Sequence, residues 1–152
     1  MMSKISAKKI ISIVLFALCV ICAFAPTMQT GTSSGEKAQF SVNAISCVNL
    51  TPFAVVALVA PVVIFLLKHI RLGIGAKNAM FIAFGILLLF SFNQCSISAH
   101  SHMRTFNPYQ VKVGFGLFAY PTATLLYLAW AYITENYTSE QILGVIGLGY
   151  TE

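Results

Sequence analysis

Four long apolar runs place the strongest constraint on how this chain can fold. They lie at about residues 10–26, 51–68, 78–95 and 113–134, and their only charged side chain is Lys68, at the end of the second run. A helix that crosses a bilayer needs about 20 mostly apolar residues. The whole chain is 58% hydrophobic and only 9% charged, which is too little charge to cover a soluble domain. The sequence therefore predicts an all-α integral membrane protein, a four-transmembrane-helix bundle that forms one domain over residues 1–152.

The first run also has features of a secretory signal peptide. "MMSKISAKK" is a basic amino-terminal region, and Ala23-Phe24-Ala25 is similar to a cleavage site. Two observations favour a retained helix instead: Pro26 would follow the cut directly, and the apolar run is long for a signal peptide. Whether residues 1–25 are removed stays open at this stage.

The distribution of basic residues predicts the orientation. Cytoplasmic loops of membrane proteins are enriched in Lys and Arg. The amino-terminal segment and the loop between the second and third runs hold six bases, whereas the other two loops hold three: Lys4, Lys8, Lys9, Lys68, Arg71 and Lys77, against Lys37, Arg104 and Lys112. We therefore expect both termini and the tail, residues 135–152, in the cytoplasm, with loops 27–50 and 96–112 outside. The expected location is a bacterial plasma membrane.

The first outer loop contains a strand pattern. In "KAQFSVNAISCV", apolar and polar residues alternate, which is typical of a half-buried β-strand. A single strand is not stable alone, so it needs a partner in the other outer loop, either "SAHSHMRTF" or "YQVKV". The sequence thus predicts a small extracytoplasmic β-sheet formed by the first and third loops.

Cys47 and Cys95 are candidates for a structural disulfide. Cys47 precedes the second run and Cys95 ends the third, so antiparallel helices would bring both to the outer surface. An oxidising compartment would favour the bond, and closing a loop of about 48 residues is worth roughly 4 kcal/mol in the chain-entropy model. The alternative is two independent thiols.

A second cysteine pair, Cys19 and Cys22, forms a CxxC motif. With Cys47 and Cys95 it resembles envelope thiol oxidases and the relatives of vitamin K epoxide reductase, and that resemblance implies quinone-linked thiol exchange. Reactive CxxC cysteines normally sit at a helix amino terminus, where the dipole stabilises the thiolate. Here the motif falls at the end of the first run, so Cys19 and Cys22 are better interpreted as small packing residues.

The stretch "FNQCSISAHSHMRTF" brings His100 and His102 close to Cys95. On a strand the two histidines would share a face, which suits metal ligation. Structural zinc sites show clearer Cys and His spacings, however. We predict no metal and no cofactor, and we interpret these histidines as part of an interaction surface.

Proline and glycine mark the second and fourth runs. Pro61 and Pro121 lie near their middles, where each leaves a backbone carbonyl without its helical donor. Gly114 and Gly116 open the fourth run and permit close approach of another segment.

Function follows partly by exclusion. No Asp, Glu, Lys, Arg or His lies in the interior of the four apolar runs, which argues against an ion-coupled transporter. No basic stripe with interleaved aromatic residues exists, so no nucleic-acid partner is predicted. The layout resembles that of claudins in outline, although the claudin Trp-x-x-Trp motif is absent from the first loop.

We therefore expect a non-enzymatic tetraspan protein, a structural or accessory subunit whose partners are the lipid bilayer and either other membrane proteins or further copies of itself. The alternatives are an oligomeric pore or small transporter, and a thiol-disulfide oxidoreductase. The interaction candidates come from the outer loops and from the apolar tail: Phe40, Val42, His100, His102, Arg104, Ile142, Leu143 and Ile146.

Overall fold

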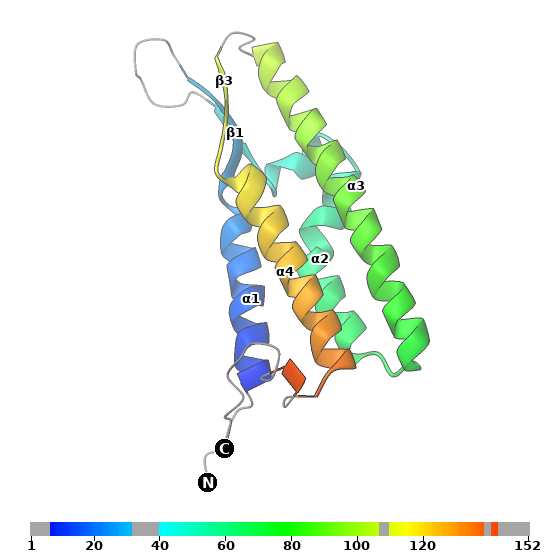
Figure 1. Cartoon of the computed structure of the whole chain (residues 1–152). Coiled ribbons are helices and arrows are strands. Elements are labelled where there is room, and N and C mark those ends of the chain that lie inside the picture. Colours follow the sequence, from blue (N-terminus) through cyan, green and yellow to red (C-terminus); the bar gives the residue numbers. More distant parts are fainter. Residues whose placement is uncertain (1–6, 32–39, 107–109, 139–140, 143–152) are drawn as a thin grey trace.

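The computed structural model describes residues 7–31, 40–106, 110–138 and 141–142, which form four helices and a small sheet (Figure 1). The elements follow one another in the order α1 (Ala7–Ala23), β1 (Pro26–Thr30), β2 (Phe40–Asn43), the 3-10 helix η1 (Ser46–Asn49), α2 (Phe53–His69), α3 (Ile74–Phe106), β3 (Val111–Val113) and α4 (Gly116–Asn136).

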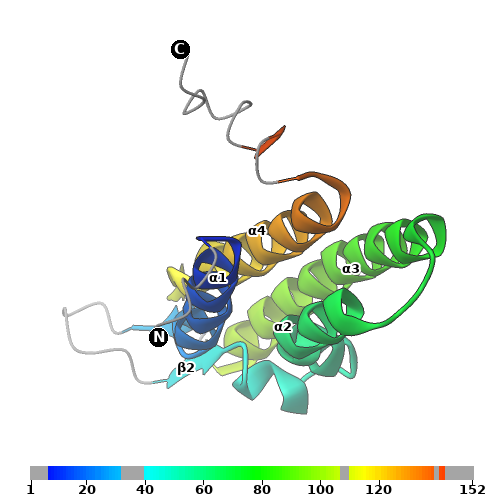
Figure 2. The same ribbon diagram turned by 90° about the horizontal axis from the view of Figure 1, so that it is seen from below.

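The helices alternate in direction, with the sheet at one end of the bundle and the short α2–α3 connection at the other (Figure 1). We call these the sheet end and the loop end. The most extensive helix contacts are those of α1 with α4 and of α2 with α3, and Figure 2 shows the two pairs side by side. Small residues line the centre of the bundle, including Ala60 on α2 and Ala123 and Ala131 on α4, so that the helices approach closely around the ring of Tyr127.

The sheet joins the two predicted outer loops, in the strand order β2-β1-β3. β2 lies within the strand pattern expected in the first loop, which gives way to η1 at Ser46. It pairs antiparallel with β1, with Thr30 opposite Phe40. β3 lies within the predicted partner "YQVKV" and pairs with the other edge of β1. The sequence pattern did not identify β1 itself, which is the central strand.

The other predicted strand partner, "SAHSHMRTF", is helical. α3 continues without interruption to Phe106, so His100, His102 and Arg104 lie on a helix. The sequence has no glycine or proline between Gly85 and Pro108, and the residue before a proline is disfavoured in the helical region. The helix therefore runs past the apolar segment until Pro108 disfavours its continuation.

The prediction of four membrane-spanning helices is wrong. Among the described residues, only Ile74–Thr105 of α3 is long and apolar enough to cross a membrane, with a mean hydropathy of 1.8 over an 18-residue window. α1 and α2 have 17 residues each, which corresponds to about 26 Å of helix against the roughly 30 Å of a bilayer core. α4 has 21 residues, but its tyrosines, threonines and proline lower its mean hydropathy.

The predicted Cys47–Cys95 disulfide is also absent, because all four cysteines are free. The turn of η1 buries Cys47 beside the hydroxyl of Thr27, and Cys95 faces inward from α3. Both side chains line one cavity, and no bond joins them across it.

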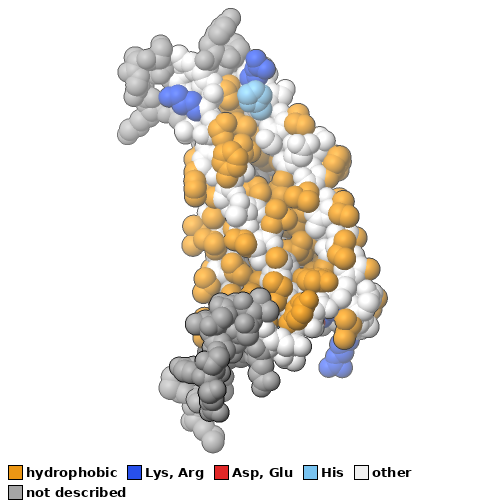
Figure 3. All heavy atoms as spheres, in the orientation of Figure 1, with side chains coloured by type: hydrophobic (Ala, Val, Ile, Leu, Met, Phe, Trp, Pro, Cys, Tyr) orange, Lys and Arg blue, Asp and Glu red, His pale blue; other side chains and the backbone are white. Residues whose placement is uncertain are grey.

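The outer surface of the bundle is strongly apolar. Large apolar side chains are at least half exposed on every helix, for example Ile21 at 68%, Val62 at 51%, Ile86 at 65% and Phe118 at 66%. On the face drawn in Figure 3, apolar side chains cover the middle, whereas the visible Lys, Arg and His side chains lie near its two ends. Patches of this extent are rare on soluble monomers, and they mark surfaces that contact lipid or protein.

Candidate functional site

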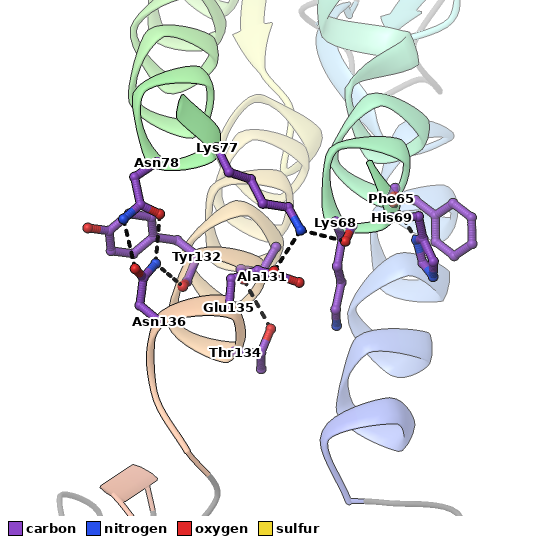
Figure 4. A network of polar contacts seen from close by, with 10 residues as sticks. All are labelled: Phe65, Lys68, His69, Lys77, Asn78, Ala131, Tyr132, Thr134, Glu135 and Asn136. Atoms are coloured by element: carbon purple, nitrogen blue, oxygen red, sulfur yellow. Dashed lines mark hydrogen bonds and ion pairs between the residues drawn. The ribbon is translucent and has the colours of Figure 1, made fainter. Parts of the chain in front are cut away.

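Lys77 and Glu135 form the central ion pair of a polar network at the loop end (Figure 4). The Lys77 ammonium lies 2.6 Å from Glu135 Oε2 and donates a second hydrogen bond of 2.8 Å to the carbonyl of Lys68. The Lys77 side chain is only 10% exposed. Because a buried ammonium is costly without such partners, this pair fixes the start of α3 against the ends of α2 and α4.

Two asparagines extend the network between α3 and α4. The Asn78 amide donates to Asn136 Oδ1 at 2.7 Å, and the Asn136 amide donates to Asn78 Oδ1 at 2.9 Å. Asn136 also donates to the carbonyl of Tyr132, one turn earlier in α4. Figure 4 shows the two amide groups facing each other beside the Lys77–Glu135 pair.

Ser12 connects α1 to the same end of the bundle. Its Oγ accepts hydrogen bonds from Lys68 Nζ at 2.9 Å and from Trp130 Nε1 at 3.1 Å, and its own hydroxyl donates to the carbonyl of Lys8. All four helices are therefore tied together by polar contacts at the loop end. We call this set of side chains the loop-end clasp: Ser12, Lys68, Lys77, Asn78, Trp130, Glu135 and Asn136.

A buried tyrosine hydroxyl joins α4 to α2, in the second turn of each helix. The Tyr120 hydroxyl donates to the carbonyl of Ala57 at 2.6 Å. Proline has no N–H, so Pro61 leaves this carbonyl without its helical donor. Tyr120 thus satisfies a carbonyl that would otherwise be buried and unpaired.

A cavity of about 290 Å³ lies between this tyrosine and the sheet end. Its lining is almost entirely apolar, and it includes both Cys47 and Cys95. Burial raises the pKa of the Cys47 thiol, and the neighbouring Thr27 hydroxyl offsets this only in part. The cavity thus holds Cys47 as a neutral thiol, which is the weaker nucleophile.

The CxxC motif lies in the last two turns of α1, as predicted from the sequence. Cys19 is fully buried in the bundle core, against the Thr124 hydroxyl, whereas Cys22 is partly exposed. Cys47 belongs to a different buried cluster, next to the sheet. The two cysteine pairs are therefore packed in separate parts of the core.

The interaction candidates near the sheet end differ in exposure. Val42 is 1% exposed and belongs to the core beneath the sheet, whereas Phe40 is 42% exposed. The ring of Phe40 lies 5.7 Å from that of His102, so β2 contacts the extended end of α3. His100 and Arg104 are exposed and line one shallow groove on α3.

The predicted tail surface falls mostly outside the described part of the chain. Ile142 donates a backbone hydrogen bond to the carbonyl of Thr138. Leu143 and Ile146 lie outside the described residues. No group of three or more potential metal ligands occurs within the described ranges.

Sequence reasoning missed the loop-end clasp. Lys77 was interpreted only as a topology signal, and Asn78, Glu135 and Asn136 were passed over. One signal was present: Lys77-Asn78 and Glu135-Asn136 are adjacent polar pairs at the start of one apolar run and at the end of another. Antiparallel neighbours would place them side by side.

Comparison of the chain with protein-family models, with curated proteins and with solved structures finds no match. The resemblances to claudins and to envelope thiol oxidases gain no support from these comparisons, so the functional argument rests on the geometry of this chain.

Proposed function

We propose that this protein is a non-enzymatic membrane protein that serves as a structural or accessory subunit of a membrane-protein complex. In this proposal α3 crosses the bilayer, α2 and α4 pack against it, and α1 packs mainly against α4. Their outward faces contact lipid and the helices of partner subunits.

The observation that carries the proposal is the distribution of apolar side chains. Residues such as Ile21, Val62, Ile86 and Phe118 face outward with more than half of their surface exposed. Burying a fully exposed side chain of this kind gains about 1.5–3 kcal/mol, and more than half of that gain remains for each of these residues because more than half of its surface is exposed. A surface of this kind is stable only when lipid or protein covers it.

The polar side chains support a structural role. At the loop end, Lys77, Glu135 and the Asn78–Asn136 pair bind one another. In the second turn of α4, Tyr120 is engaged by the Ala57 carbonyl, and the Cys47 thiol is buried. These groups hold helices together, which is the pattern expected of a scaffold.

Native mass spectrometry of the tagged protein, purified in mild detergent from its own host at native expression level, tests the proposal. A foreign membrane subunit at a fixed stoichiometry is the expected result. The Phe118→Asn variant changes an exposed apolar side chain of α4 and should weaken that association if α4 contacts the partner; Lys112→Gln changes an exposed charge outside the helices and should leave it intact.

Two other results would overturn the accessory role. A defined homo-oligomer with no foreign subunit would favour a pore, which conductance in liposomes would then examine. A monomer bound to no other protein would show that the apolar faces contact only lipid.

A further inference from the structure

The sheet end of α3 carries a groove of about 620 Å³ whose chemistry differs from that of the cavity inside the bundle. One cation, Arg104, and one imidazole, His100, line it one helical turn apart. Ser96 and Ser101 add hydroxyl groups, while Met28 and Ile97 supply an apolar floor and edge. Residues four apart on a helix face the same side, so Arg104 and His100 can contact one ligand.

The groove is cationic, and no described carboxylate neutralises it. Glu135 is the one acidic residue in the described part of the chain, and it binds Lys77 at the opposite end of the bundle. The guanidinium of Arg104 is exposed and presents a planar set of donors that matches the oxygens of a phosphate.

An apolar stripe leads directly into this groove along the same face of α3. It consists of Ile82, Ile86, Leu89 and Ile97, with the polar Asn93 between the last two, and all five are exposed and spaced by three or four residues. His100 and Arg104 continue the same spacing. At 1.5 Å per residue, His100 lies about 16 Å from Leu89 along the helix, close to half of the roughly 30 Å bilayer core.

We propose that this face of α3 binds an anionic phospholipid, with its phosphate held by Arg104 and His100 and an acyl chain laid along the stripe from Ile97 toward Leu89. The inference rests on the membrane location in the proposed function. A free phosphate would use Arg104 and His100 alone, whereas a phospholipid accounts for the apolar stripe as well. The expected ligand is thus a lipid with one net negative charge in the leaflet at the sheet end.

Thermal unfolding of the purified protein in mild detergent tests the assignment without any partner protein. The protein is titrated separately with dioleoyl phosphatidylglycerol, with dioleoyl phosphatidylcholine and with inorganic phosphate. Phosphatidylglycerol should raise the unfolding midpoint at a concentration well below that needed for phosphatidylcholine, and inorganic phosphate should leave the midpoint unchanged.

Three variants locate the site. Arg104→Gln should raise the half-saturating concentration of phosphatidylglycerol by about tenfold, the equivalent of one charge-assisted hydrogen bond. Ile97→Asn should also weaken lipid binding, because it interrupts the apolar stripe. Lys112→Gln removes the same charge from exposed β3, outside the groove, and should bind like the wild type.

Each contrary result overturns the assignment. Equal effects of Arg104→Gln and Lys112→Gln would show general charge attraction, and a midpoint raised equally by inorganic phosphate would show a free-anion site. No response to phosphatidylglycerol would exclude the lipid site. The accessory role would fail differently, through the absence of a partner in native mass spectrometry.

Discussion

The Tyr120 hydroxyl on α4 donates a 2.6 Å hydrogen bond to the Ala57 carbonyl on α2, the group that Pro61 deprives of its helical donor. Tyr120 on α4 thus supplies the hydrogen bond that Pro61 on α2 cannot donate. Tyr120 is 3% exposed, so water cannot easily replace its hydroxyl. This contact fixes α4 against the second turn of α2, next to the cavity that is lined by Cys47 and Cys95.

Removal of the Tyr120 hydroxyl should destabilise the bundle. Tyr120→Phe leaves the buried Ala57 carbonyl unpaired, which costs about 1–3 kcal/mol. In a Pro61→Ala background the restored N–H can bind this carbonyl, so the same change should cost clearly less. Chemical denaturation in mild detergent measures the free energy of unfolding of the wild type, of the two single variants and of the double variant. Tyr132→Phe, at a partly exposed ring, is the matched control, and an equal loss in both backgrounds would contradict the role given to Pro61.

The Lys77–Glu135 pair yields a prediction with two parts. Glu135→Gln should destabilise the protein by about 1–3 kcal/mol, because the ammonium of Lys77 is buried and then lacks its counter-charge. The double variant Lys77→Met, Glu135→Met should cost less than the single change, since no charge is left unpaired. Denaturation midpoints compare the two. A double variant less stable than Glu135→Gln would show that the ion pair itself stabilises the clasp.

Gly114 should be intolerant of any side chain. A Cβ atom there would collide with the carbonyl oxygen of Pro26, and this contact is between backbone segments that cannot easily separate. Gly114→Ala should therefore lower the unfolding midpoint and the yield of folded protein. Gly75→Ala, in the first turn of α3, meets nothing within 4 Å and should be neutral or slightly stabilising, since alanine favours helix. Equal unfolding midpoints of the two variants would contradict the close approach of Gly114 to the Pro26 carbonyl.

The four thiols should all be alkylated in denaturant without any reductant, because no disulfide is present. Intact mass after reaction with iodoacetamide counts them, and a shortfall of two would indicate a bond. In the native protein, Cys47 should react slowly near neutral pH, since burial raises the pKa of its thiol.

The raised pKa of Cys47 also sets the sign of its effect on stability. The folded protein holds this proton more tightly than the unfolded chain does. The contribution of this thiol to the stability of the folded protein is therefore complete at pH values below the ordinary thiol pKa. It is lost as the pH rises through the higher pKa that the thiol has in the folded protein. Cys47→Ala should flatten the alkaline loss of stability relative to the wild type. An unchanged alkaline profile would assign the loss to other groups.

The sequence was sufficient to predict where helices lie and that two loops form a sheet. The apolar runs indicate α1, α2, α4 and the start of α3 within a few residues, and the alternation around Phe40 indicates β2. It was not sufficient for the end of α3, where "SAHSHMRTF" was a candidate strand partner but is helical, because no helix breaker precedes Pro108.

The candidate sites depended on contacts that periodicity does not reveal. Cys47 and Cys95 were correctly placed at the same end of the bundle, yet sequence position cannot tell a shared cavity from a bond. Lys77 and Glu135 are 58 residues apart, so their pairing follows only from the packing of α3 against α4. Length excludes α1 and α2 as full membrane spans, because each has only 17 residues, whereas the polar side chains of α4 exclude that longer helix.

The location of α3 in the bilayer is tested most directly by fluorescence quenching of a single tryptophan. In a Trp130→Phe background, which removes the only native tryptophan, Ile86→Trp and Arg104→Trp place a probe at the middle and at the sheet end of α3. The protein is reconstituted in liposomes with chain-brominated lipid or treated with iodide. The predicted result is strong bromine quenching at position 86 and iodide quenching at position 104. Iodide quenching at position 86 without bromine quenching would contradict a membrane-spanning α3.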